Sequence, residues 1–163
     1  MGAEFDASWS LDSSAHATAR AFCCLNARAV DYARFWLVFL DGGRFNGHQV
    51  VPAAWVAQST AAQGLAGFDD TARRNIERPA SPNPAFYAWQ WRRPAADAAA
   101  GVILVDRVPG PDFYAQGLHG QILYIAPESS SVVLRLGSRW GEVNWPVWMR
   151  QFARDNPQAT RGQ

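Results

Sequence analysis

The segment between Ala27 and Leu40 constrains the fold of this chain most strongly, because it is apolar around almost its whole circumference. Asn26 is a suitable helix N-cap, and Asp41-Gly42-Gly43 has the glycines that end helices, so the pattern predicts a helix between them. Only Asp31 and Arg34 interrupt the apolar positions. A helix of this kind must be buried on most sides. The rest of the chain is therefore expected to build a core around it.

The segments that flank this helix are more polar. Residues 1–20 are mostly small and polar and predict an irregular lead-in. After the helix, Asn46-Gly47 predicts a turn, and Pro52 suits the first turn of a second helix that runs to about Thr60. Residues 62–85 predict a long loop, because their last part is rich in proline.

The second half of the chain is richer in strand-forming residues. Short apolar runs predict strands at 86–91, 102–105, 113–117, 121–126 and 131–136, with a hairpin turn at 127–130. Sequential strands usually pair with their neighbours, so we expect an antiparallel meander. An amphipathic helix is predicted over 145–154, with these residues on or near one face: Val147, Trp148, Met149 and Phe152. The expected fold class is α+β, of the α/β-sandwich type, with the last helix laid across the meander.

Composition excludes several functions. All 15 basic residues are arginine. These residues therefore cannot support a mechanism that needs a lysine base, a lysine Schiff base or a Walker-loop lysine. The formal net charge is +1, so we expect no nucleic-acid partner. The longest apolar run, Phe35 to Leu40, is far shorter than the ~20 residues that span a bilayer, so no membrane span is expected. The first residues do not resemble a signal peptide.

The cysteines and histidines favour no metal site. Cys23 and Cys24 are adjacent, and sequence neighbours rarely satisfy disulfide geometry, so we interpret them as two small buried hydrophobes. His16 and His48 have no partner at ligand spacing. No metal and no cofactor are therefore expected. The eight tryptophans are interpreted mainly as core residues, because several lie in apolar helices: Trp36, Trp55 and Trp148.

Three stretches of the sequence resemble β-lactamase and penicillin-binding-protein-like serine hydrolases. They are Asn26–Phe35, Leu40–Val56 and Gly117–Glu128. The first two resemble the end of a helix of that family, the turn after it and a second helix. The third resembles the hairpin that follows the family's third motif. Class C β-lactamases, esterases and 6-aminohexanoate-oligomer hydrolases are the most similar subgroups. The resemblance implies that residues 1–80 are the last part of a helical lobe. It also implies that residues 86–163 form the strands that follow this lobe in the sheet, and the final helix, of the same catalytic domain.

The resemblance also implies acyl transfer by a serine in a Ser-x-x-Lys motif, assisted by a tyrosine in Tyr-x-Asn. Because the sequence has no lysine, Ser-x-x-Lys cannot be formed here. Both motifs would precede residue 1, so this C-terminal part is expected to be inactive alone. Such proteins are found in the bacterial periplasm or cytoplasm.

The family's third motif corresponds to Ala115-Gln116-Gly117. In the family this strand supplies an oxyanion-hole donor and aligns the substrate, which implies roles for Gln116, Gly117, Leu118 and Gly120. The usual cation of the motif is absent, which disfavours a β-lactam carboxylate and favours a small amide or ester. His119 is the candidate catalytic residue, as a proton relay or a replacement for that cation.

Two other kinds of protein remain open. One is a non-catalytic binding or regulatory module. The other is a self-contained hydrolase that uses Asp112, His119 and one of the serines at 129–131, although no Gly-x-Ser-x-Gly elbow surrounds them. By resemblance, further strands and a helix complete the fold. We therefore expect an open edge at 131–136 and a bare face around Trp145, Trp148 and Phe152, covered by the missing N-terminal segment or by a second copy.

Overall fold

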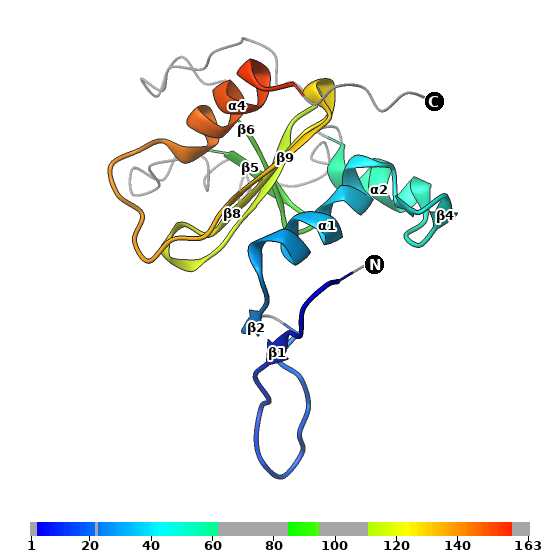
Figure 1. Cartoon of the computed structure of the whole chain (residues 1–163), viewed down its shortest axis with the longest axis vertical. Helices are drawn as coiled ribbons and strands as arrows, with labels where there is room; N and C mark the ends of the chain where they lie inside the picture. The colour runs from blue at the N-terminus through cyan, green and yellow to red at the C-terminus, as the bar shows by residue number, and fades with distance from the viewer. Residues whose placement is uncertain (1–2, 22, 62–84, 95–110, 158–163) are drawn as a thin grey trace.

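The computed structural model describes residues 3–21, 23–61, 85–94 and 111–157. The predicted strand at 102–105 and nearly all of the predicted loop at 62–85 lie outside these residues. The main unit is a five-stranded antiparallel sheet whose strands follow their order in the chain, so the predicted meander is confirmed (Figure 1). Its strands are β5 (Ala85–Ala88), β6 (Trp91–Pro94), β7 (Phe113–Gln116), β8 (Ile122–Ala126) and β9 (Ser131–Arg135).

Two helices cover the sheet, one on each face (Figure 1). Helix α1 (Ala29–Leu40) packs on β8 and β9 from one side, and α4 (Trp145–Asp155) packs on the same strands from the other. Strand side chains alternate between the two faces, so β8 contributes to both cores and is apolar along its length. The core on the α4 side contains Tyr114, Ile122, Tyr124, Ala126, Met149 and Ala153, and the core on the α1 side contains Trp91, Phe113 and Ile125.

Helix α1 is less buried than its sequence predicts. It begins after Arg28, while the predicted N-cap, Asn26, lies in a strand. Val38 is buried, but Val30 and Phe35 are each 40% exposed, because the described residues cover only the sheet side of the helix. Asp31 is buried instead. Its carboxylate accepts a hydrogen bond from the backbone N–H of Glu4 at 2.9 Å and pairs with Arg34 at 3.3 Å.

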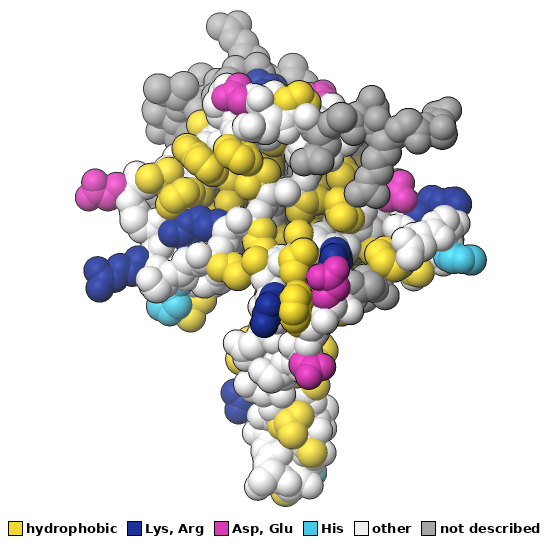
Figure 2. All heavy atoms as spheres, viewed as in Figure 1, with side chains coloured by type: hydrophobic (Ala, Val, Ile, Leu, Met, Phe, Trp, Pro, Cys, Tyr) yellow, Lys and Arg dark blue, Asp and Glu magenta, His cyan; other side chains and the backbone are white. Residues whose placement is uncertain are grey.

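Helix α4 leaves part of its apolar face exposed, as expected around Trp148 and Phe152. Pro146, Met149, Arg150 and Ala153 are buried, whereas Trp148 and Phe152 are 48% and 44% exposed. The two exposed rings stack on each other with centroids 5.2 Å apart. The same view in Figure 2 shows hydrophobic side chains gathered over the region of α4. The core interpretation is therefore wrong for Trp148, and it is also wrong for Trp55, which is 41% exposed.

The predicted strand at 86–91 is in fact a hairpin. Strands β5 and β6 are joined by Trp89-Gln90, and both residues have the left-handed backbone conformation, with φ of 54° and 68°. Two such residues make the tight turn that joins antiparallel strands. The prediction missed this turn because the usual Asn-Gly or Asp-Gly signal is absent.

The short elements before the sheet agree with most predictions. Strands β3 (Arg44–Phe45) and β4 (His48–Gln49) form a hairpin around the predicted turn at Asn46-Gly47. Helix α2 (Ala53–Thr60) follows Pro52 as expected. No helix among the described residues is both long and apolar enough to cross a membrane.

The described part of the predicted lead-in is irregular for most of its length, but a short hairpin closes it. Strands β1 (Ser8–Trp9) and β2 (Leu25–Asn26) pair with each other, and the chain between them forms a loop that projects from the body (Figure 1). We call residues 3–26 the N-terminal arm. Cys23 and Cys24 lie on it and are joined in a disulfide bond. Cys24 is exposed and Cys23 half-buried, so the interpretation of two buried, unlinked residues is wrong.

A buried polar contact fixes α4 to the sheet. The hydroxyl of Tyr124 on β8 donates to Asp112 Oδ2 at 2.6 Å, and Arg150 Nε on α4 lies 3.5 Å from the same oxygen. Burial raises the pKa of Asp112, although the Tyr124 hydrogen bond and the Arg150 charge act in the opposite direction. Burial and the neighbouring carboxylate raise the pKa of Tyr124, so its hydroxyl stays a donor at neutral pH.

Replacing Tyr124 with phenylalanine tests this contact. Tyr124→Phe removes the donor to a buried carboxylate, and we expect the free energy of unfolding to fall by about 1.5–3 kcal/mol. Tyr114→Phe is the matched control, because its ring stacks on Tyr124 but its hydroxyl makes no hydrogen bond within the described residues. Urea unfolding at pH 7, followed by far-UV circular dichroism, measures both. Equal losses for the two variants would contradict the assigned role of the Tyr124 hydroxyl.

Candidate functional site

A cleft of about 900 Å³ opens on the α1 side of the sheet. Its walls come from α1, α2, the turn between β5 and β6, and strands β7 to β9. Seven of the described lining residues are aromatic: Tyr32, Phe35, Trp36, Phe39, Trp55, Trp89 and Trp91. Clefts of this size with apolar and aromatic walls and a few polar groups are typical of small-molecule sites.

Trp91 packs against aromatic rings from α1 and β7. Its ring makes edge-to-face contacts with Trp36, Phe39 and Phe113, at centroid distances of 4.8, 4.9 and 5.0 Å. Such pairs contribute about 0.5–1.5 kcal/mol each beyond the area that they bury. Trp91 is itself buried, at 5% exposure. The wall is therefore a rigid surface that links α1 to the middle of the sheet.

The end of β7 forms the polar side of the cleft. Gln116 and Gly117 both line it. The N–H of Gly117 donates to Gln121 O at 2.8 Å, so this N–H closes the β7–β8 hairpin and is not available as an oxyanion donor. Two buried polar atoms of cleft residues have no hydrogen-bond partner among the described residues: the acceptor Gln116 Oε1 and the donor Trp36 Nε1. Buried groups of this kind are normally paired.

The other predicted site residues lie on the turn beyond the cleft. Leu118, His119 and Gly120 form a short 3-10 turn, η2 (Leu118–Gly120), and none of them is among the described lining residues. Leu118 is 76% exposed and His119 is also exposed, with a left-handed φ of 59°. Gly120 is buried. The structure thus brings Gln116 and Gly117 together at the cleft and places the other three beside it.

Two side chains that sequence reasoning missed hold this turn in place. Arg135 on β9 donates to the carbonyl oxygens of His119, Gly120 and Arg139, and its guanidinium lies 4.1 Å from the ring centre of Trp145. The amide of Gln121 exchanges two hydrogen bonds with the backbone of Gly137. An arginine at a strand end gives no local signal for this role, since its partners come from 15 residues earlier and 4 residues later in the chain.

The self-contained hydrolase is wrong, because its residues are not brought together. Asp112 and Ser129 line a small pocket of about 210 Å³ at one end of the β7–β8 hairpin, and His119 lies in the turn at the other end. The length of β8, five residues at about 3.3 Å each, separates these ends. In addition, the carboxylate of Asp112 already contacts Tyr124 and Arg150.

The remaining candidates for metal binding are scattered. His16 lies on the N-terminal arm beside Ser13, and His48 lies on β4, exposed. Among the described residues, no group of three histidine, cysteine, aspartate or glutamate side chains is placed to hold a metal ion.

An antiparallel meander with a helix on each face matches the α+β class and the part of a β-lactamase-like fold that the sequence resemblance implied. A solved structure with this fold is a Bacillus anthracis protein assigned as a 6-aminohexanoate-dimer hydrolase, with a TM-score of 0.58 and 23% sequence identity. The match covers 85% of this chain and 31% of that one, so the chain spans about a third of its length. No known family model and no curated protein sequence matches the chain.

Gly120→Ala tests the turn that carries the candidate residues. Gly120 has φ of +78°, and a Cβ there would lie 2.5 Å from Arg135 Nη1. We expect unfolding free energy to fall by about 1–2 kcal/mol for the left-handed backbone alone, and further because the guanidinium must move. Gly141→Ala is the matched control, since Gly141 has φ of +67° with no atom within 4 Å of the added Cβ. Equal losses in urea unfolding would show that Arg135 does not restrict the turn.

Proposed function

We propose that this chain is part of a β-lactamase-like serine hydrolase that cleaves amide or ester bonds through an acyl-enzyme. The position of the cleft carries the proposal. It lies at the end of β7, where the sequence resemblance puts the substrate-aligning motif Ala115-Gln116-Gly117. The fold is shared with the protein assigned as a 6-aminohexanoate-dimer hydrolase. In this proposal residues 1–80 end a helical lobe, and 86–163 supply strands and the final helix of the same domain.

The lining of the cleft supports a substrate with an uncharged reactive part. None of the described lining residues has a charged side chain. A carboxylate in the cleft would therefore meet no cation from the described residues, which disfavours β-lactams. An amide group offers both a donor and an acceptor, and could pair with Gln116 Oε1 and Trp36 Nε1 if side-chain movement exposes them. A linear amide or ester with an aliphatic chain against the aromatic wall fits these groups best.

The acylating serine is proposed to come from outside these 163 residues. Ser59 is the one serine among the described lining residues, and its hydroxyl donates to Val56 O at 3.4 Å. Lysine is absent from the sequence, and no histidine is among the described lining residues, so Ser59 has no base at the cleft. Tyr32 also lines the cleft, but burial raises its pKa and its hydroxyl donates to Leu25 O. It is therefore a neutral donor.

His119 is proposed as a proton relay or substrate contact in the assembled enzyme. The proposal rests on the position of His119 on η2, in the turn between β7 and β8. This position is two residues after Gly117, which lines the cleft. Leu118 and Gly120 are proposed to shape the same turn. A binding module without chemistry would use the cleft but not His119.

A linear N-acyl alkyl amide titrated into the chain tests the cleft. We expect tryptophan fluorescence to change on saturation, and Gln116→Met to weaken binding by roughly 2- to 13-fold, the value of one hydrogen bond of about 0.5–1.5 kcal/mol. Gln151→Met, on the exposed side of α4, is the matched control and should bind like the parent.

The same samples test the chemistry. Intact-mass analysis after incubation with a fluorophosphonate is expected to show no covalent label on this chain. A stoichiometric label would place the nucleophile within these residues and contradict that part of the proposal. Binding that Gln116→Met leaves unchanged would remove Gln116 from the site.

A second copy of the chain, or the remaining part of the domain, is proposed to cover two open surfaces. Strand β9 pairs with β8 and with no other described strand, and Trp148 and Phe152 are exposed on α4. Unpaired strand edges and contiguous apolar surfaces both promote association.

Sedimentation at tens of micromolar tests this association. We expect the isolated chain to dimerise, and Phe152→Glu to weaken the dimer at least about tenfold by placing a charge in its apolar contact. Gln151→Glu adds the same charge beside the patch and should leave the dimer intact. A monodisperse monomer with a sharp cooperative melt would contradict the proposal.

A further inference from the structure

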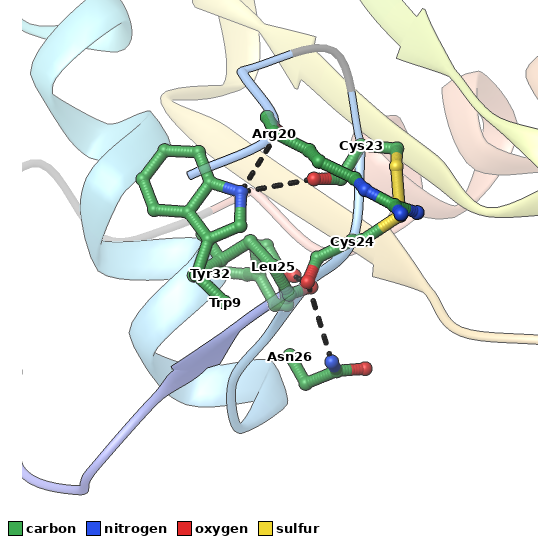
Figure 3. The surroundings of a disulfide bond; sticks show 7 residues. All are labelled: Trp9, Arg20, Cys23, Cys24, Leu25, Asn26 and Tyr32. Carbon is green, nitrogen blue, oxygen red and sulfur yellow. Dashed lines mark hydrogen bonds between the residues drawn. A yellow bond between two sulfur atoms is a disulfide. The ribbon is translucent and has the colours of Figure 1, made fainter. Parts of the chain in front are cut away.

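The disulfide between Cys23 and Cys24 lies on the N-terminal arm (Figure 3). Leu25 and Asn26, which follow Cys24 directly, line the cleft. Cys24 is exposed and Cys23 half-buried, so solvent and small reagents reach the pair. The sequence contains no other cysteine. Every thiol reaction of these 163 residues therefore reports on this site.

The backbone at the two cysteines is held by hydrogen bonds that do not involve sulfur. The indole N–H of Trp9 donates to Cys23 O at 2.9 Å (Figure 3). The N–H of Ser10 donates to Cys24 O at 3.2 Å, and the N–H of Cys23 donates to Arg20 O at 3.1 Å. Cys24 has a left-handed φ of 72° within this turn. Because these contacts need no S–S bond, the turn can keep both sulfurs close after the bond opens.

We propose that Cys23 and Cys24 form a reversible disulfide–dithiol site whose reduced form binds trivalent organoarsenicals through both sulfurs. A dithiol reductant opens the site: it gives two electrons and two protons to the cysteines and leaves as its own cyclic disulfide. The two thiols then condense with an arsine oxide, R–As=O. Two As–S bonds form, the oxygen leaves as water, and no electrons are transferred. This site is independent of the proposed hydrolase activity.

The ligand class follows from the number of donors. Structural zinc sites take four ligands, but the described residues contain no group of three potential metal ligands. A trivalent arsenic atom that carries one organic group needs only two further bonds. Two adjacent thiols on one turn supply them, and the second bond forms intramolecularly, which strengthens binding by about 10²–10⁴-fold over a single thiol.

Iodoacetamide labelling of the whole chain tests the disulfide half of the proposal. We expect no label before reduction, and two labels on the monomer after treatment with dithiothreitol and its removal. Labelling without reductant, or a chain linked to a second chain on a non-reducing gel, would overturn this half.

Phenylarsine oxide tests the dithiol half. One equivalent is expected to protect both thiols of the reduced chain, and 2,3-dimercaptopropanol should reverse the protection. Cys23→Ser and Cys24→Ser should each bind about 10²–10⁴-fold more weakly. Trp9→Phe, which removes the indole donor to the turn, should bind measurably more weakly than Trp148→Phe, its control on α4. Protection no better than in the single-cysteine variants would overturn the chelate, and equal binding by the two tryptophan variants would overturn the role of the turn.

Discussion

The edge-to-face contacts of Trp91 determine how the two halves of this chain meet. One indole, on a strand that begins with it, touches Trp36 and Phe39 of α1 and Phe113 of β7. These contacts hold the helix against the sheet and also set the shape of the aromatic wall. The cleft thus follows from core packing, because the rings that bury the α1 face of the sheet continue into its lining.

Polar anchors hold the opposite ends of the central hairpin. At one end, Asp112 joins Tyr124 to Arg150 and so ties α4 to β8. At the other, Arg135 and Gln121 fix the turn that follows Gln116 and Gly117. A hairpin restrained at both ends can present the end of β7 in one geometry, which a substrate-aligning strand requires. Sites of this kind need the supporting side chains as much as the ones that face the cleft.

Local patterns were sufficient to predict most of the fold. The strands at 113–116, 122–126 and 131–135 and the helices at 53–60 and 145–155 agree with their predictions within about two residues. One error arose where the partner is distant in the chain, and another where a local turn signal is absent. Trp148 was interpreted as a core residue, but Arg150, which contacts Asp112, is buried on α4 instead. The hairpin turn at Trp89-Gln90 has no usual turn residue to reveal it.

The candidate site was predicted less completely. Gln116 and Gly117 could be selected, because their place before the turn resembles a known motif. The aromatic wall could not, because Trp36, Trp55 and Trp91 come from three elements that only the folded chain brings together.

The N-terminal arm contacts the rest of the structure at a few places near its ends. These include the hydrogen bond from Glu4 to Asp31, the cation–π contact of Arg28 with Phe5 and the hydrogen bond from Tyr32 to Leu25. Its remaining described backbone bonds are mostly internal. Opening the arm would therefore leave both cores intact, so its amide hydrogens should exchange in a separate, lower-energy event than those of β8.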